Sequence, residues 1–302
     1  MAEYRKEYSL YLAYQRGYSP STISSYESDI GDFLSYLGEK SYNDVDSDFI
    51  ASYLFSKMGD GSLGKRSIQR HLSALRGYFD FLLEKGEVAQ NPFRLTQTPK
   101  GGTHYPERLF LEDAKRLLEE NAKRDDDLAL RDQAILELLF SSGLRASELV
   151  SLTPLQIDFA NKTMLIHGKG NKDRYVPFSD ECAKVLKDYL RNSRPFLLDK
   201  SHKARKSDRV FLSSKGDSLT VRGLEYILSS IQQRLGESLR LHPHLLRHTF
   251  ATLLLEGGAD IRYIQELLGH SSINTTQVYT HLTQKDLSEE YEAHFPKPKL
   301  KN

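Results

Sequence analysis

The residues best suited to chemistry lie between His244 and His281, where histidine, arginine and tyrosine recur at short intervals. His244 and Arg247 stand three residues apart, so on a helix their side chains leave the same face. His270 directly follows a glycine, and Tyr279 comes shortly after it. This stretch therefore brings together a cation, two imidazoles and a phenol.

Those residue types favour attack on a phosphodiester. The non-bridging oxygens gain negative charge during attack, and a guanidinium group matches their geometry with two hydrogen bonds. Histidine can donate to the same oxygens or transfer a proton near neutral pH. A tyrosine hydroxyl, with an ordinary pKa of about 10, becomes a useful nucleophile in a cationic site.

Each of these residues also has a simpler interpretation when taken alone. A His-x-x-Arg pair is common, and a single tyrosine such as Tyr279 most often packs in a half-buried position. His244 and His248, four residues apart, could instead ligate a metal ion. The helical zinc-protease pattern has a glutamate directly after its first histidine, whereas Leu245 stands there. The ordered combination is much more specific than any one member.

Three short helices are predicted to position these residues. The pair Gly257-Gly258 is expected to end the first helix, because glycine tolerates the left-handed conformation found at helix ends. Asp260 is a suitable N-cap for a second helix that ends at Gly269. Ser271 can begin a third helix, which carries Tyr279.

A further arginine follows a predicted helix end upstream. Gly143 should stop one helix, and Arg145 then lies in the first turn of the next. Arg145 and Glu148 could form a simple surface pair, worth about 0.2–0.5 kcal/mol. Beyond them, residues 157–159, 163–167 and 175–178 predict a small antiparallel sheet.

These motifs together resemble the tyrosine recombinase, or phage integrase, family. His244-x-x-Arg247, Leu-Gly-His270 and Tyr279 are similar to the box that closes its catalytic domain, and Ser-Gly-Leu-Arg-x-Ser-Glu-Leu is similar to its first arginine box. The motif at residues 268–281, Leu-Gly-His-Ser-Ser-x-x-Thr-Thr-Gln-x-Tyr-Thr-His, is most similar to that of the bacterial Xer recombinases. The resemblance implies six catalytic residues, Arg145, Lys169, His244, Arg247, His270 and Tyr279.

The family mechanism gives each of them a role. Tyr279 would attack a DNA phosphate and form a 3′-phosphotyrosine, while the two arginines hold the non-bridging oxygens. Lys169, in the turn at residues 168–173, would protonate the leaving 5′-oxygen. His244 would take the tyrosine proton and His270 would donate to the phosphate. No metal or other cofactor is expected, since the arginines supply the positive charge and the phosphotyrosine conserves the bond energy.

The N-terminal part of the chain reads as helices, and one of them carries a basic face. Most such faces are simply solvated. By resemblance to the core-binding domain of the same family, this helix would instead lie against DNA. Lys172 in the turn at 168–173 and Arg174 just after it are further predicted phosphate contacts. The full set of predicted DNA contacts is Lys65, Arg66, Arg70, Lys172 and Arg174.

The predicted fold is mainly α and has two domains, for which 302 residues are sufficient. Residues 1–95 form a four-helix, SAM-like core-binding domain, and residues 96–107, which are polar and rich in glycine and proline, form a linker. Residues 108–302 form an α+β catalytic domain. By resemblance, its C-terminal segment packs on a neighbouring protomer.

The amino-acid composition sets few limits on the kind of molecule that the protein binds. Lys+Arg number 42 and Asp+Glu 41, so only local basic patches can bind nucleic acid. A single cysteine, Cys182, excludes an internal disulfide framework and fits a reducing compartment. No apolar run approaches the roughly 20 residues of a membrane span. We therefore expect a cytoplasmic protein without membrane contact.

The resemblance implies a site-specific recombinase that acts on double-stranded DNA through a Holliday junction. Four protomers would bind two duplexes, either alone or with a second recombinase, and a DNA translocase could activate them. Resolution of chromosome dimers at a dif-like site is the expected role. The alternatives are the integrase of a mobile element, relaxation of one duplex as in type IB topoisomerases, and a DNA-binding relative without activity.

Overall fold

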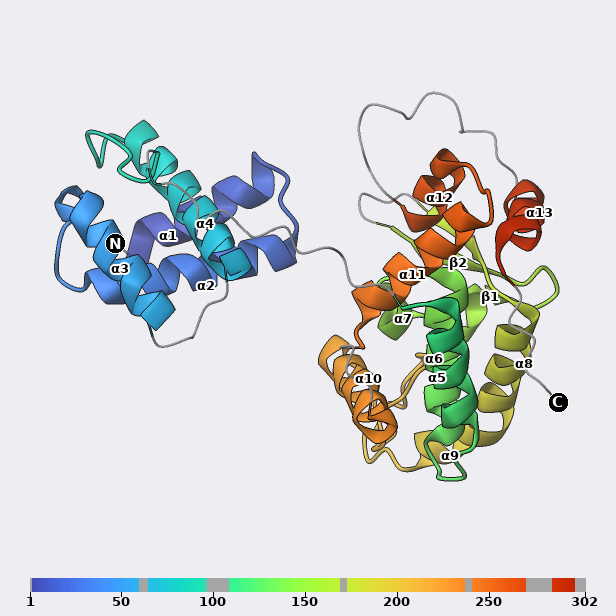
Figure 1. Ribbon diagram of the computed structural model, residues 1–302. Coiled ribbons are helices and arrows are strands. Elements are labelled where there is room, and N and C mark those ends of the chain that lie inside the picture. The colour runs from blue at the N-terminus through green and yellow to red at the C-terminus, as the bar shows by residue number, and fades with distance from the viewer. Residues whose placement is uncertain are drawn as a thin grey trace. The chain divides into compact units, whose positions relative to one another are not determined.

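The computed structural model describes residues 2–59, 65–94, 96, 109–168, 173–236, 241–269 and 284–296 (Figure 1). The chain forms two compact units, Met1–Tyr105 and Pro106–Asn302. Each unit has its own core and is described separately.

The first unit consists of four helices, α1 (Ala2–Tyr14), α2 (Pro20–Leu37), α3 (Ser47–Gly59) and α4 (Lys65–Glu84). The hydroxyl of Ser19 caps α2 by accepting a hydrogen bond from the backbone N–H of Thr22. The helix ends at Gly38, which has a φ of 64°. The predicted four-helix domain is thus confirmed.

Aromatic side chains fill the core of this unit. The ring of Phe33 makes edge-on contacts with Tyr53, Phe79 and Phe93, at centroid distances of 5.2–5.8 Å. Such pairs add about 0.5–1.5 kcal/mol each to the effect of burial. They join α2, α3 and α4 into one packed body.

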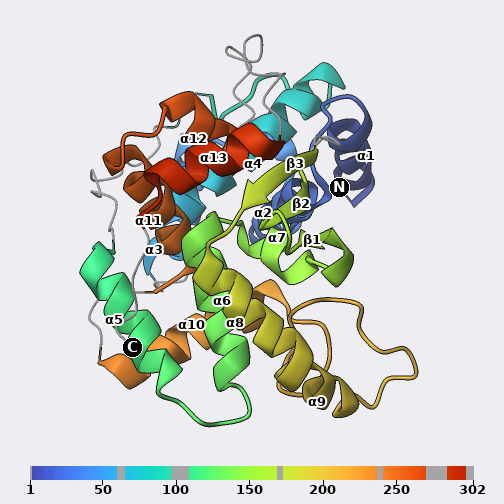
Figure 2. The same ribbon diagram turned by 90° about the vertical axis from the view of Figure 1, so that its right-hand side faces the viewer.

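The second unit is built around α6 (Ala129–Ser142), which is buried along nearly its whole length. Helices α5 (Leu111–Ala122), α8 (Asp180–Asp188) and α11 (Pro243–Glu256) pack against it. Figure 2 shows α5, α6 and α8 running side by side. A single π-helical turn (Tyr189–Ser193) joins α8 to α9 (Arg194–Asp199), and α10 (Val221–Leu235) contacts α5.

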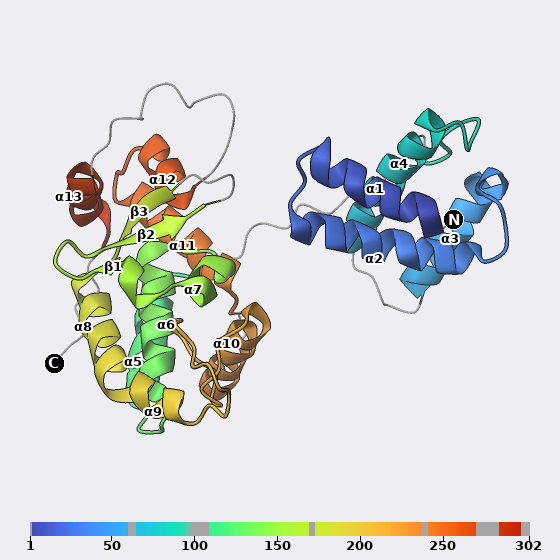
Figure 3. The same ribbon diagram turned by 180° about the vertical axis from the view of Figure 1, so that it is seen from behind.

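The predicted sheet is also confirmed. Its strands are β1 (Ile157–Asp158), β2 (Thr163–His167) and β3 (Asp173–Pro177), antiparallel and in the order β1-β2-β3. Thr163 pairs with Pro177 and His167 with Asp173. The third strand therefore begins two residues earlier than the sequence predicted, at Asp173. Figure 3 shows β3 beside α12 (Ile261–Leu268).

The helix ends near the candidate site agree with the sequence. Helix α11 ends at Glu256, before Gly257. The Asp260 carboxylate caps α12 by accepting from the N–H of Arg262 at 2.7 Å. Gly269 ends α12 with a φ of 63°. The helix predicted to begin at Ser271 lies outside the described residues. Among the described helices, none has the length and apolarity needed to cross a bilayer.

The last helix, α13 (Gln284–His294), packs on the core of its own chain. Tyr291 and Phe295 are buried, and the Phe295 ring lies 5.8 Å from that of Phe140 and 5.7 Å from that of Phe250. The Tyr291 hydroxyl donates to the carbonyl of Ser141 at 2.8 Å. Removing this helix would expose that core, so a C-terminal truncation would perturb the fold as well as any contact with a neighbour.

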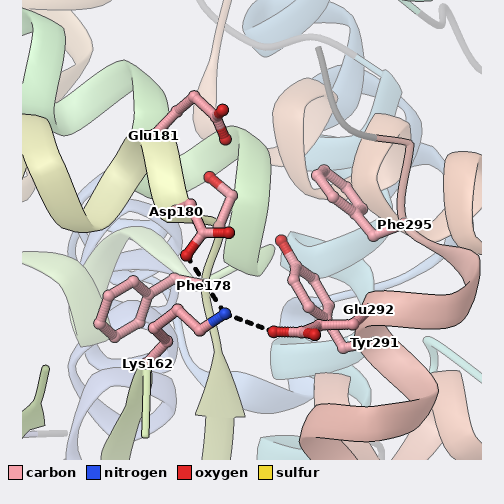
Figure 4. Close-up of a pocket in the computed structure, with 8 residues that line it drawn as sticks. Lys162, Phe178, Asp180, Glu181, Tyr291, Glu292 and Phe295 are labelled. Atoms are coloured by element: carbon pink, nitrogen blue, oxygen red, sulfur yellow. Dashed lines mark hydrogen bonds and ion pairs between the residues drawn. The ribbon is translucent and has the colours of Figure 1, made fainter. Parts of the chain in front are cut away.

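Charged residues lie at the edge of the contact between α13 and the rest of the domain. The Lys162 ammonium lies between the carboxylates of Glu292 on α13 and Asp180 on α8, 3.2 Å from the latter. Figure 4 shows these groups at the mouth of a small pocket that Phe178 and Tyr291 also line. The ion pairs are partly exposed, so the apolar side chains beneath them contribute most of the stability.

Substitution of Phe295 by alanine should lower the free energy of unfolding by about 3–5 kcal/mol, since it removes a buried aromatic ring and leaves a cavity. Urea unfolding of the DNA-free protein measures this. Lys285→Ala, on the exposed side of α13, should change stability by at most about 0.5 kcal/mol. Equal stabilities for the two variants would show that α13 is not docked on its own domain.

Candidate active site

Arg145 is positioned by a tight connection between α6 and α7 (Ala146–Ser151). Gly143 ends α6 with a φ of 60°, and a Cβ atom there would lie 2.3 Å from Cδ1 of Phe250. Only glycine satisfies both conditions. Leu144 is buried, and Arg145 then serves as the N-cap residue of α7, with extended backbone angles. Its side chain is 36% exposed.

Glu148, one turn into α7, holds Arg145 from two directions. One carboxylate oxygen accepts from Nη1 of Arg145 and the other from its backbone N–H, both at 2.9 Å. Arg174 on β3 forms a bidentate pair with the same carboxylate, also at 2.9 Å. The Glu148 side chain is only 9% exposed. The simple surface pair considered from the sequence is therefore wrong, because a second arginine buries the carboxylate.

The surroundings of Glu148 keep it ionised. Burial by itself raises the pKa of a carboxyl group. Here the hydrogen bonds and charge of Arg174, with those of Arg145, outweigh burial and hold the pKa of Glu148 below its ordinary value.

Arg247 lies on α11, one turn after His244, and is buried. Its Nη1 donates to the carbonyl of Gly143 at 2.7 Å and its Nη2 to that of Leu268 at 2.6 Å. Both carbonyls lie at helix C-termini, where partial negative charge favours a cation. Burial, together with the nearby charges of Arg145 and Arg174 and against the attraction of Glu148, lowers the pKa of Arg247 to about 10. The group remains charged at neutral pH.

The C-terminus of α12 joins these side chains. Three consecutive backbone carbonyls there each accept from a different arginine: Leu267 from Arg174 at 2.8 Å, Leu268 from Arg247 at 2.6 Å and Gly269 from Arg145 at 2.9 Å. With the Glu148 carboxylate, the cluster carries a formal charge of +2, three cations less one anion. The cluster is partly exposed and has a net positive charge, so it is suited to bind an anion such as a phosphodiester.

The predicted catalytic residues are only partly covered by the structure. It brings Arg145 and Arg247 to the same helix end, and it places His244 in the exposed first turn of α11. The N-cap of that helix is His242, whose Nδ1 accepts from the N–H of Leu245 at 3.1 Å. The remaining predicted catalytic residues, Lys169, His270 and Tyr279, lie outside the described residues, and the roles of all six stay predictions.

The predicted DNA contacts differ in their surroundings. Arg70 is 46% exposed, and its Nε and Nη2 donate to the carboxylate of Asp29 at 2.8 and 2.7 Å. Arg174 is 7% exposed and makes its hydrogen bonds inside the protein, which does not favour the surface phosphate contact expected for it. Lys172 and the side chains of Lys65 and Arg66 lie outside the described part.

Comparison with known proteins follows the same division of the chain. Residues 107–286 match the phage integrase family, and residues 6–86 match the phage integrase N-terminal SAM-like domain. The tyrosine recombinase XerC of Bacillus subtilis (strain 168) is 37% identical over 297 residues, 97% of this chain and 96% of that protein. The chain belongs to the phage integrase family of tyrosine recombinases. It is therefore an enzyme that cuts and rejoins DNA.

Other relatives agree with this assignment. XerC of Bacillus pumilus (strain SAFR-032) is 41% identical over 290 residues, 95% of this chain and 94% of that one. Among solved structures, XerH recombinase bound to its difH substrate is 25% identical, with a TM-score of 0.63, covering 88% of this chain and 77% of that chain. The Tn1549 transposon integrase, 20% identical with a TM-score of 0.68, covering 95% of this chain and 98% of that chain, shares the fold.

Inorganic phosphate should stabilise the free enzyme, because an anion between Arg145 and Arg247 offsets the repulsion of the arginine cluster. A concentration of 100 times Kd would add about 2.7 kcal/mol. Thermal unfolding in phosphate, compared with chloride at equal ionic strength, measures the effect. Arg145→Gln should remove most of it, whereas Lys184→Gln, an exposed lysine of α8, should respond as the unaltered protein does. An undiminished response in Arg145→Gln would contradict an anion site here.

Proposed function

We propose that this recombinase acts at a specific DNA site and forms a 3′-phosphotyrosine through Tyr279. The observation that supports this most strongly is the meeting of Arg145 and Arg247 at the C-terminal end of α12. Two guanidinium groups held by helix-end carbonyls are fixed in position, and each matches the geometry of the non-bridging oxygens of a phosphate. Such pre-organised donors, each worth roughly 3–4 kcal/mol at a transition state, are an effective source of catalysis.

The chemical step conserves charge and bonds. The Tyr279 oxygen bonds to phosphorus, and the bond from phosphorus to the 5′-oxygen breaks. His244 accepts the phenolic proton, while Lys169 protonates the departing 5′-oxygen. His270 donates a hydrogen bond to the phosphate. Attack by the freed 5′-hydroxyl of another strand reverses these transfers and rejoins the DNA.

The biological substrate that we propose is a dif-like chromosomal site. The XerC relatives match this chain over nearly its full length, and the XerH relative is bound to a difH site. Exchange between two duplexes would use four protomers and a Holliday junction, with or without a second recombinase and a translocase activator. The alternative role in a mobile element has weaker support, because the transposon integrase resembles this chain in fold alone.

Two further parts of the chain would take part in assembly. Lys65, Arg66 and Arg70 of α4 are proposed to contact DNA, which for Arg70 means giving up the carboxylate of Asp29 for a phosphate. Helix α13 is proposed to couple neighbouring protomers. One side of α13 packs on its own chain, so the coupling would use the exposed side of the helix or would release its contact with Phe140 and Phe250.

Replacement of Tyr279 by phenylalanine should abolish covalent attachment to DNA and leave binding unchanged, since only the nucleophilic oxygen is removed. The substrate is a nicked duplex carrying a dif-like sequence, and the adduct is detected by denaturing electrophoresis. Tyr14→Phe, at an exposed tyrosine of α1, should form the adduct normally. An adduct that survives in Tyr279→Phe would assign the nucleophile to another residue.

Recombination and topoisomerase activity predict different products from two duplexes. The proposed enzyme should convert a pair of site-bearing duplexes into four-way junctions and recombinants, which native electrophoresis resolves. Relaxation of supercoiled DNA without any exchanged strands, under conditions in which the covalent adduct forms, would instead support the topoisomerase alternative.

A further inference from the structure

Arg174 is a charged residue on the buried side of a strand. Along β3 the side chains alternate, so that Asp173 and Tyr175 are exposed while Arg174 and Val176 are buried. The strand begins at Asp173, four residues after Lys169 in the sequence. An arginine in this place needs partners inside the protein, since an unpaired buried charge would be strongly destabilising.

Its partners belong to two other elements of the active site. Nη1 and Nη2 donate to the two oxygens of Glu148 on α7, each at 2.9 Å, and Nε donates to the carbonyl of Leu267 on α12 at 2.8 Å. Gly269 lies against the guanidinium, and a Cβ atom there would be 3.2 Å from Cζ of Arg174. One side chain thus connects β3, α7 and the end of α12.

Glu148 in turn uses all its acceptor capacity on two arginines. Each oxygen accepts one hydrogen bond from Arg174 and one from Arg145. An ionised carboxylate has about four acceptor positions, so these four bonds fix its rotation. The direction in which Glu148 holds the Arg145 guanidinium therefore depends on Arg174.

Arg174 also carries an electrostatic cost, because its charge adds to the repulsion felt by Arg247. Buried ion pairs of this kind add little net stability compared with apolar residues of similar size. Stability alone therefore does not explain a third guanidinium at this site, whereas an effect on the geometry of the other two does.

We propose that Arg174 is a positioning residue for DNA cleavage: it holds Glu148 and the end of α12 so that Arg145 faces the scissile phosphate. It acts through these groups and does not touch the DNA. The inference rests on the proposed function, in which Arg145 binds a non-bridging oxygen.

Arg174→Lys and Arg174→Met test the proposal. Lysine keeps the charge but cannot form the bidentate pair, and methionine removes both. Single-turnover formation of the Tyr279 adduct on the nicked duplex, at saturating protein, should slow roughly 10- to 100-fold in each variant. The Kd for the duplex should change less than twofold. Arg194→Lys, at a partly buried arginine that also donates to backbone carbonyls, serves as the control and should cleave normally.

The pH profile separates positioning from a general loss of structure. Without Arg174, burial of Glu148 is opposed mainly by Arg145, so the pKa of Glu148 rises. The protonated carboxyl group of Glu148 cannot accept hydrogen bonds from both the backbone nitrogen and Nη1 of Arg145. The cleavage rate of Arg174→Met should therefore fall as the pH decreases through this raised pKa, in a range where the unaltered enzyme keeps its rate. Adding Glu148→Gln should remove this acidic limb and hold the rate near its low-pH value at every pH, because the neutral amide, like the protonated acid, has a single acceptor oxygen for Arg145.

Three results would overturn the inference. Weaker duplex binding with an unchanged saturated rate would make Arg174 a phosphate contact. A slower rate with an unaltered pH profile and a matching loss of folded protein would make it purely structural. Normal cleavage by both variants would give it no role. If the unaltered protein itself forms no adduct, the proposed function fails, which is a distinguishable outcome.

Discussion

The C-terminal end of α12 is the feature on which the active site depends. Its last carbonyls have no partner within the helix, and three guanidinium groups satisfy them in succession. One buried carboxylate, Glu148, limits the repulsion among these cations. The result is a cluster that is held firmly by the protein and still carries excess positive charge. Glycine at positions 143 and 269 allows the backbone to turn closely enough for this arrangement.

Much of this could be predicted from the sequence because it depends on local rules. The helix ends at Gly143 and Gly269 follow from the conformational freedom of glycine, and the cap at Asp260 follows from its side chain. After α11 the left-handed residue is Gly258, with a φ of 93°, whereas Gly257 keeps right-handed angles. His244 and Arg247 are a helical turn apart, so their shared face was also predictable. The six catalytic positions came from resemblance, and the structure bears only on those within its described residues.

The environment of Arg174 could not be predicted in the same way. The apolar pattern suggested a strand starting at Tyr175, which left Arg174 at the edge of a turn and apparently on the surface. Pairing of His167 with Asp173 extends β3 by two residues and turns the arginine inward. Strand register is set by long-range pairing, which no local pattern reveals. The available signal was that Arg174 stands two residues before Val176 and so lies on the same face of a strand, where a charge beside a buried apolar residue implies a buried partner.

Phe250 connects the C-terminal helix to the backbone that holds Arg247. It lies one turn beyond Arg247 on α11, and its ring fills the space that Gly143 leaves open. The same ring also contacts Tyr291 of α13 and Phe295 just after it. Displacement of α13 would therefore loosen the packing of the Phe250 ring against Gly143. The carbonyl of Gly143 accepts a hydrogen bond from Arg247. The docking of α13 on its own domain and the position of Arg247 therefore share one aromatic ring, so movement of α13 would also alter how this guanidinium is held.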